Sequence, residues 1–452
     1  MGILLIMTTI VCKISSAQRQ QNKIKSLRIA FSGGPFMFVL PIIVTALGVF
    51  LLFKLRFFSI LHPIKTARGC ISSVMDGGFF SLALALAGTL GVGNIFGVAI
   101  SITVGGAGSV LWLLISSVFA AIIKYAEALV SVDALEGASQ GGMMYVIRKR
   151  LKNGKFLGNL YAAICLLLAF VMGAAMQSSA AVSSAVLVSD MPKSAFTVGF
   201  VALTLIFIFG NREKIKTVTA ILIPVAALCY SIISLAVIFR HFGEIPRVIN
   251  LVISSALTPR AAGGGILGYL AASPIVRGYS TGILSNEAGA GTSSMAHASF
   301  KDKTPAFAGL SGMLEAILDT AVFCMLTAFA ILLPNPELSG ISGAELVVSS
   351  LSHAFPYADT VLLVSVTAFA LAAVVCWYYY GSVCSRYLFG VRADRLFFAI
   401  YCVAVLAGAL FDCSVFASLS DVLLLLLALL TAPVIIKSSD RIKTLSELEG
   451  II

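Results

Sequence analysis

Residues 87–97 read AGTLGVGNIFG and lie within an otherwise apolar run, with LALAL before them and VAISI after them. The stretch contains four glycines, a threonine and an asparagine, a composition that disfavours a continuous helix. Within a bilayer, backbone groups that are not bonded inside a helix cost several kcal/mol each unless they line a polar cavity. The stretch therefore predicts a broken membrane helix whose interruption forms a binding site.

The composition of the whole chain indicates a polytopic membrane protein. Of the 452 residues, 59% are hydrophobic and 11% are charged, and the mean hydropathy is +1.02. Water-soluble chains of this size are far more polar. The nine cysteines lie mostly singly in apolar segments, without CxxC pairs or metal-ligand spacing. We interpret them as small core residues in a reduced setting.

Apolar segments separated by turn or charge signals predict eleven membrane spans. The predicted spans lie at about 36–53, 79–104, 107–131, 157–189, 194–210, 216–240, 264–298, 305–333, 360–385, 393–411 and 417–436. The predicted units are a basic leader (1–30), an extra N-terminal span (31–60), a ten-helix core (61–437, with repeats at about 79–240 and 264–437) and a cytoplasmic tail (438–452).

The distribution of basic residues predicts the orientation of the chain. Apart from the leader, most Lys and Arg residues of the predicted loops fall on the side that holds the first loop and the C-terminus. Cytoplasmic loops carry the excess of these residues, so we place that side in the cytoplasm. The net charge of +11 is then explained by topology, and no nucleic-acid partner is expected.

A second interrupted stretch lies at residues 285–293, which read SNEAGAGTS. Ten spans remain when the first is set aside. If they divide into two sets of five, the sets are inverted relative to each other, because five crossings end on the opposite side of the membrane. The two interrupted stretches then fall in the first span of each set. Interrupted segments at corresponding positions of two halves indicate a transporter site near the bilayer midplane.

The ends of two broken helices can hold a zwitterion. Half-helix N-termini present free N–H groups, which suit a carboxylate, while C-terminal ends present carbonyls, which suit an ammonium group or a cation. Glycines allow close approach to the backbone, and the neighbouring polar and short apolar side chains favour a small neutral amino acid. The predicted binding residues at the breaks are Thr89, Gly91, Val92, Gly93, Asn94, Leu284, Ser285, Asn286, Glu287 and Gly289.

Two alternative interpretations of the glycines remain. They could form small-residue faces for helix packing, as in Gly93-xxx-Gly97. A dinucleotide-binding loop is not favoured, because GVGNIFG lacks the GxGxxG spacing. Glu287 favours the binding site, because an ionisable residue within a span is expensive and marks a functional site by default.

Further polar residues within the spans are candidates for ion coupling. Glu315 and Asp319 are four apart and share a helix face, as for a proton relay or for structural pairing with a basic residue from a loop. For Lys124 and Glu127, three apart, we expect a local ion pair. For His297, the alternative is a solvated side chain without a role in coupling. For Thr327, the alternative is a hydroxyl bonded to its own helix. The predicted coupling candidates are Glu287, Asp319, Thr327 and His297.

The chain resembles the alanine or glycine:cation symporters from about residue 51 to 437. The matching motifs are AGTLGVGNIFGVAISITVGGAGSVLW (87–112), KYAEAL (124–129), GGMMYVI (141–147), GNREKIKTVTAILIP (210–224), SNEAGAG (285–291), DTAVFCMLTA (319–328) and CWYYYGSVCSRYLFG (376–390). The resemblance implies an all-α protein with a LeuT-type five-plus-five inverted repeat and one additional N-terminal helix. It implies import of a small neutral amino acid with Na⁺, sometimes H⁺, and it places Gln177 at the substrate.

The resemblance also implies a multi-pass monomer in the lipid of a bacterial or archaeal cell membrane, with no cofactor other than the coupling ion and no enzymatic activity. Three departures from the family pattern concern that ion. Val92 replaces a usual threonine, and Ala372 and Ala373 replace a usual pair of hydroxyl residues that resembles part of a sodium site. Na⁺ is a hard cation that needs oxygen ligands, so we expect weak or absent dependence on Na⁺.

Several functional alternatives are left open by the sequence. The carrier could bind sodium with fewer protein ligands, couple to a proton, or move its substrate without an ion, and a transport-dead amino-acid sensor is a further alternative. A channel is less favoured, because most spans are apolar all round. An intramembrane enzyme is also less favoured, because no nucleophile and base pair and no HExxH pattern is present in the sequence.

Overall fold

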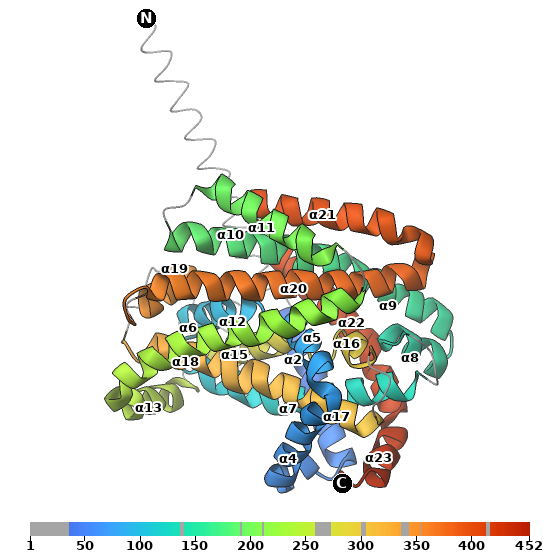
Figure 1. The fold of residues 1–452 in the computed structure, drawn as a ribbon. Coiled ribbons are helices and arrows are strands. Elements are labelled where there is room, and N and C mark those ends of the chain that lie inside the picture. Colours follow the sequence, from blue (N-terminus) through green and yellow to red (C-terminus); the bar gives the residue numbers. More distant parts are fainter. Residues whose placement is uncertain are drawn as a thin grey trace, which may run out of the picture.

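The computed structural model describes residues 36–135, 140–189, 192–209, 212–257, 273–299, 304–335, 343–352, 354–412 and 416–452. Every regular element within these ranges is a helix. Figure 1 shows the long helices running side by side, with α13 and α19 at one end of the bundle and α8 and α23 towards the other. The predicted leader, residues 1–30, lies outside the described residues.

Eight of the described helices are long and apolar enough to cross a membrane: Pro63–Thr89, Ser109–Asp133, Gly154–Val188, Glu213–Arg240, Pro305–Leu332, Ala358–Phe389, Val391–Leu410 and Phe416–Lys437. Three shorter apolar helices cover Phe38–Lys54, Gly93–Gly105 and Lys193–Ile208. The all-helical, multi-pass architecture predicted from the sequence is therefore confirmed.

A kinked helix precedes the first interrupted span. Helix α4 (Pro63–Ser73) leads into α5 (Phe79–Thr89) through a π-helical turn at Val74–Gly78. Gly77 has a φ of 96° in this turn, a conformation that glycine adopts without steric cost. Helix α5 thus begins at the predicted start of the span, residue 79, directly after this kink. Helix α5 is followed by a π-helical turn (Gly93–Gly97) and by α6 (Val98–Gly105).

Helices α9 (Gly154–Leu168) and α10 (Gln177–Val188) form one continuous span through the π-helical segment Ala169–Met176. Gly173 in this segment packs against α20 (Ala358–Phe389), where an added Cβ would lie 2.2 Å from the Cβ of Trp377. The glycine therefore permits the close approach of the two helices. The π-helical segment ends immediately before Gln177, and such irregular turns are frequent at functional sites.

The second interrupted span contains α15 (Pro274–Asn286) and α16 (Ser294–His297). It packs against α7 (Ser109–Asp133), which also contacts α17 (Pro305–Ala316). Helix α17 continues through the π-helical segment Ile317–Cys324 into α18 (Met325–Leu332). Helices α7 and α20 are buried along most of their length, whereas α12 and α21 keep exposed apolar faces, as expected for helices that face lipid.

The other described helices complete the bundle and its ends. Their bounds are α2 (Phe36–Lys54), α3 (Phe58–Leu61), α8 (Met143–Arg150), α11 (Lys193–Ile208), α12 (Arg212–Arg240), α13 (Ile245–Ser255), α19 (Gly343–Leu351), α21 (Asp394–Leu410), α22 (Phe416–Lys437) and α23 (Ser439–Leu448).

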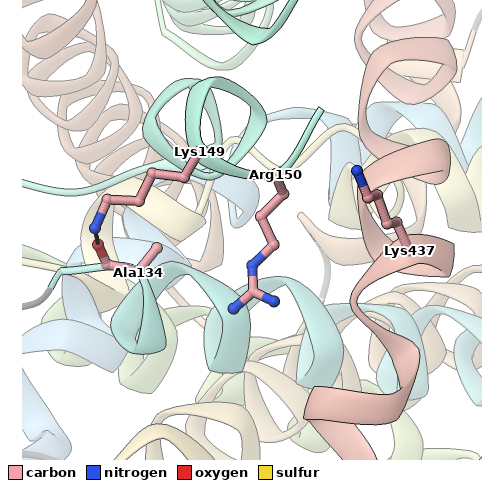
Figure 2. Close-up of a pocket in the computed structure, with 4 residues that line it drawn as sticks. All are labelled: Ala134, Lys149, Arg150 and Lys437. Carbon is pink, nitrogen blue, oxygen red and sulfur yellow. Dashed lines mark hydrogen bonds between the residues drawn. The ribbon is translucent and has the colours of Figure 1, made fainter. Parts of the chain in front are cut away.

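Charged residues from several loops that were predicted to be cytoplasmic meet at one end of the bundle. Lys54 donates to Asp440 at 2.5 Å, and this hydrogen bond, together with the charge of the lysine, lowers the pKa of that carboxyl. Arg441 likewise donates to Asp133 at 2.8 Å. A pocket of about 420 Å³ at this end is lined by Ala134, Lys149, Arg150 and Lys437, and Figure 2 shows its three basic side chains coming from two helices. Segments that were predicted to share one side of the membrane therefore meet at one end of the bundle.

Candidate functional site

Asp319 joins the two interrupted helices. Its Oδ1 accepts a hydrogen bond from Asn94 Nδ2 at 2.7 Å, and its Oδ2 accepts from Ser285 Oγ at 2.8 Å. Thr320 also donates to Oδ2 at 2.9 Å. Asp319 is fully buried, and it forms no ion pair with a basic side chain of the described residues. The structure thus places a carboxylate without a cationic partner exactly where the two breaks meet.

The first break is stabilised by Asn94 and Gln177. After α5 ends, the Gly91 amide donates to Asn94 Oδ1 at 3.3 Å, and the Val92 amide donates to Gln177 Oε1 at 3.4 Å. An added Cβ at Gly91 would lie 2.9 Å from Gln177 Nε2. The structure therefore brings these four predicted residues together and uses two side-chain amides to bond the interrupted backbone.

Gly93 lies at the accessible surface of the first break. It is exposed although its neighbours Val92 and Asn94 are buried, and an added Cβ would meet no described atom within 4 Å. Leu284 and Ser285 of the second break are half-buried. Open space beside a glycine is the place where a ligand can approach the backbone closely.

The substitution Gly93→Ala tests this surface. Because the added methyl group meets no protein atom within 4 Å, we expect the thermal stability to stay unchanged. A methyl group that competes with a bound ligand costs about 1–3 kcal/mol, so we expect the apparent Kd for the amino acid to rise about tenfold or more. Ligand-dependent thermal shifts of the purified protein measure both quantities.

Gly91→Ala is the matched comparison, because its Cβ would collide with Gln177. We expect this variant to lose stability as well as affinity. An unchanged Kd in a stable Gly93→Ala protein would contradict a ligand position next to Gly93.

The second break is held largely by its own side chains. Asn286 Nδ2 donates to Thr320 Oγ1 at 3.1 Å, and its Oδ1 accepts from the Ala288 amide at 2.9 Å. Asn286 is fully buried, so in this conformation its amide shapes the break. Gly289 has a φ of 90° and faces α2, where its Cβ would lie 3.2 Å from Val44 Cγ2. The structure does not bring Gly289 to the group around Asp319.

Glu287 points towards a different cluster from the one that contains Asp319. It is 2% exposed and has a φ of 54°, a conformation that costs a residue other than glycine about 1–3 kcal/mol and is found at functional sites. Thr292 Oγ1 donates to its Oε2, whereas its Oε1 has no hydrogen-bond partner among the described residues. Glu287 therefore bonds within the second break itself.

The expected local ion pair between Lys124 and Glu127 is wrong. Lys124 is fully buried, and its Nζ donates to Glu315 Oε1 and to Ser293 Oγ, both at 2.9 Å. Glu127 instead accepts from the Gly291 amide at 3.0 Å. Tertiary packing overrides the local pairing here, because both side chains point into the bundle towards the second break.

His297 and Glu315 also differ from the expectations. His297 is 1% exposed and not solvated, and its Nε2 lies 3.0 Å from Glu315 Oε2. The basic partner of Glu315 comes from helix α7 and not from a loop. Glu315 and Asp319 share a helix but bond separate groups, so the structure shows no direct relay between them.

Hydroxyl groups near the first break are engaged with the backbone. Thr327 Oγ1 lies 3.0 Å from the carbonyls of both Asn94 and Phe323, and 2.7 Å from Tyr230 Oη. Thr327 therefore bonds both its own helix and the first break. Thr89 Oγ1 bonds back to the Ala85 carbonyl at 3.4 Å, and the break does not use it.

Ala372 and Ala373 are fully buried on α20. Their methyl groups supply no oxygen ligand to the core. One turn later, Cys376 Sγ contacts the Leu84 carbonyl at 3.0 Å and Trp377 Nε1 donates to the Gly88 carbonyl at 3.3 Å. These contacts fix α20 against the helix that leads into the first break.

Comparisons with known proteins identify the family of the chain. Residues 21–446 match the sodium:alanine symporter family. The sodium/alanine symporter AgcS of Methanococcus maripaludis is 31% identical over 405 residues, covering 84% of this chain and 86% of that protein. An uncharacterized transporter of Haemophilus influenzae is 30% identical over 398 residues, covering 85% and 87%.

A likeness to a solved structure supports the fold. The crystal structure of MhsT in complex with L-phenylalanine matches with a TM-score of 0.55 at 16% identity, covering 79% of this chain and 88% of that one. The LeuT-like helical architecture implied by the resemblance is thereby supported. The chain belongs to the sodium:alanine symporter family, which is a family of transporters.

Proposed function

We propose that the protein imports a small neutral amino acid together with a cation by alternating access. The observation that carries this proposal is Asp319, a buried carboxylate that bonds both interrupted helices at once. Because Asp319 bonds both breaks, a ligand that binds one relative position of the breaks more tightly shifts the equilibrium towards that position. The relatives named as sodium/alanine and sodium/glutamine symporters support amino-acid transport.

The substrate lies next to Gly93 in this proposal, between the first break and the half-buried Leu284 and Ser285. Gln177 is bonded to the Val92 amide and lies beside the same surface. Leu284 and Val92 provide apolar contacts that suit a short aliphatic side chain such as that of alanine.

The cation lies at the oxygen group around Asp319. Ser285 and Thr320 bring hydroxyl oxygen atoms to this carboxylate, and hard cations prefer such ligands. The site around Ala372 and Ala373 has no side-chain oxygen to offer. The proposal therefore keeps one cation position and predicts a weakened dependence on Na⁺.

A thermal-shift screen of the purified protein against the natural amino acids, with and without Na⁺, tests the proposal directly. A ligand that binds only the native state raises the apparent stability by mass action. We expect alanine or glycine to give a shift. No shift with any neutral amino acid would contradict the proposal, and binding without uptake into proteoliposomes would identify an amino-acid sensor.

Replacing Na⁺ by choline during uptake into proteoliposomes gives a prediction about the ion. We expect uptake of labelled alanine to fall but to stay above that of empty liposomes, because the chain lacks hydroxyl groups at residues 372 and 373. A fall to the level of empty liposomes would contradict the weakened dependence, and unchanged uptake would indicate a carrier that does not use Na⁺.

The finer architecture is also part of the proposal. We assign a five-plus-five inverted repeat within residues 61–437, preceded by the extra span at 31–60 and followed by a cytoplasmic tail. The pairing of the two breaks at Asp319 and the likeness to MhsT support this assignment. We also propose that the protein works as a monomer in the cell membrane.

A further inference from the structure

A second polar cluster surrounds the second break. We call it the Lys124 network, and it consists of Lys124, Glu127, Glu287, His297 and Glu315. The side chains come from α7, from the break, from α16 and from α17. All five residues are at most 2% exposed, so the network is isolated from solvent.

The network has more acidic than basic groups. Glu315 is satisfied, because Lys124 bonds its Oε1 at 2.9 Å and His297 lies 3.0 Å from its Oε2. Glu127 and Glu287 then remain without a cation of their own. Uncompensated charges in a dry interior cost several kcal/mol each, so these two carboxyl groups require a proton or a bound cation.

Two oxygen atoms show where the compensating charge can sit. Glu127 Oε2 and Glu287 Oε1 are buried and have no hydrogen-bond partner among the described residues. The other oxygen of each group is occupied, since Gly291 donates to Glu127 and Thr292 donates to Glu287. A protonated carboxyl needs only one such free oxygen.

We propose that the Lys124 network is a proton-binding site of the carrier and that Glu127 is the carboxyl that accepts and releases the transported proton. This inference rests on the proposed function and adds a second ion to it. The proton site is separate from the cation position at Asp319, because the hydrogen bonds described for its five residues do not include Asp319.

A proton fits this site better than a metal ion. The described residues contain no group of three or more His, Cys, Asp and Glu side chains that could hold a metal ion. A sodium ion needs several oxygen ligands, whereas Glu127 and Glu287 each have one free oxygen. A proton bonds covalently to a single carboxyl oxygen and needs no coordination shell.

Other titratable groups that face the network do not carry its excess charge. Tyr161 donates to the Ala290 carbonyl at 2.8 Å. The thiols and phenols around the acidic groups are ordinarily neutral at pH 7. They are Tyr161 and Cys165 on α9 and Cys376, Tyr380 and Cys384 on α20. Asp319 lies in the π-helical segment Ile317–Cys324 that follows α17. Lys216 on α12 donates to the Ser299 carbonyl at 3.2 Å beyond α16.

Glu127 is positioned to couple its proton to the movement of the break. It lies on the long helix α7 and holds the amide of Gly291, a residue with a φ of 71° in the break. A hydrogen bond to a carboxylate is roughly twice as strong as one to a neutral carboxyl group. Loss of the proton therefore strengthens the attachment of the break to α7, and protonation weakens it.

The experiment measures proton movement in proteoliposomes that contain a pH-sensitive dye, with equal Na⁺ on both sides. We expect addition of L-alanine to acidify the lumen with the wild-type protein. In Glu127→Gln, we expect alanine-driven acidification to fall to background while exchange of labelled alanine stays measurable. Glu127→Asp keeps a titratable group and should retain acidification with an altered pH midpoint, and Glu213→Gln, an exposed carboxyl on α12, should behave as the wild type.

Each outcome separates the two proposals. Alanine exchange without acidification in the wild type overturns the proton site and leaves the proposed function standing. Absence of alanine exchange in the wild type overturns the proposed function. Acidification that persists in Glu127→Gln overturns the role of Glu127. If Glu127→Gln does not fold, the pH midpoint of Glu127→Asp decides, and a midpoint equal to that of the wild type overturns the role.

Discussion

Asn94→Ala is expected to abolish saturable amino-acid uptake while the protein still reaches the membrane. Asn94 bonds Asp319 through Nδ2 at 2.7 Å and accepts the Gly91 amide at 3.3 Å, so its removal frees a buried carboxylate and the first break together. A hydrogen bond to a charged group contributes about 1.5–3 kcal/mol, which corresponds to roughly 10- to 150-fold in rate for this bond alone.

Uptake of labelled alanine into proteoliposomes over a range of concentrations measures this effect. Asn159→Ala is a suitable control, because Asn159 is an exposed asparagine on α9 far from the breaks in sequence. We expect the control to keep wild-type kinetics. If Asn94→Ala shows the wild-type KM and maximal rate, Asn94 does not belong to the site.

The same substitution at Asn286 tests a different role, although the sequence predicts that both asparagines bind the substrate. Asn286 is fully buried and bonds Thr320 and the Ala288 amide. Its loss therefore acts through the shape of the second break. The sequence shows that both asparagines accompany the breaks, but only the tertiary contacts show which of them bonds the shared carboxylate.

The breaks themselves are predictable because they depend on local chemistry. Glycines and an asparagine within an apolar run disfavour a helix whatever packs around them. The structure ends α5 at Thr89 and α15 at Asn286, within the stretches that the sequence marks. The predicted start of the first interrupted span, residue 79, coincides with the first residue of α5, because the kink at Gly77 separates α5 from the helix before it.

Contacts between distant segments are not predictable in the same way. Lys124 and Glu127 are close enough in sequence for a local pair, yet Lys124 bonds Glu315, 191 residues away. Which of two allowed partners a buried lysine takes depends on the packing of α7 against α17. Likewise, Gly289 faces α2, a helix outside the predicted repeat. The sequence signal of the Lys124 network is the presence of ionisable residues such as Lys124, Glu287 and Glu315 inside apolar runs, which is itself expensive.

Lys124→Met is expected to destabilise the protein more than any other substitution considered for this chain. Lys124 and Glu315 are both fully buried and joined at 2.9 Å, and removing one partner of a buried ion pair costs about 3–5 kcal/mol. Methionine fills similar volume, so the loss reflects the unpaired Glu315 carboxylate and not a cavity. Thermal unfolding of the purified protein in detergent measures the change.

The double variant Lys124→Met/Glu315→Gln distinguishes the buried ion pair from a general effect of substitution in the core. Removing both charges relieves the unpaired carboxylate, so we expect most of the lost stability to return. Lys54→Met is the matched control, because Lys54 pairs with the exposed Asp440 and such surface pairs contribute about 0–1 kcal/mol. A double variant as unstable as Lys124→Met would show that Lys124 stabilises the fold through Ser293 and the second break, and not through Glu315.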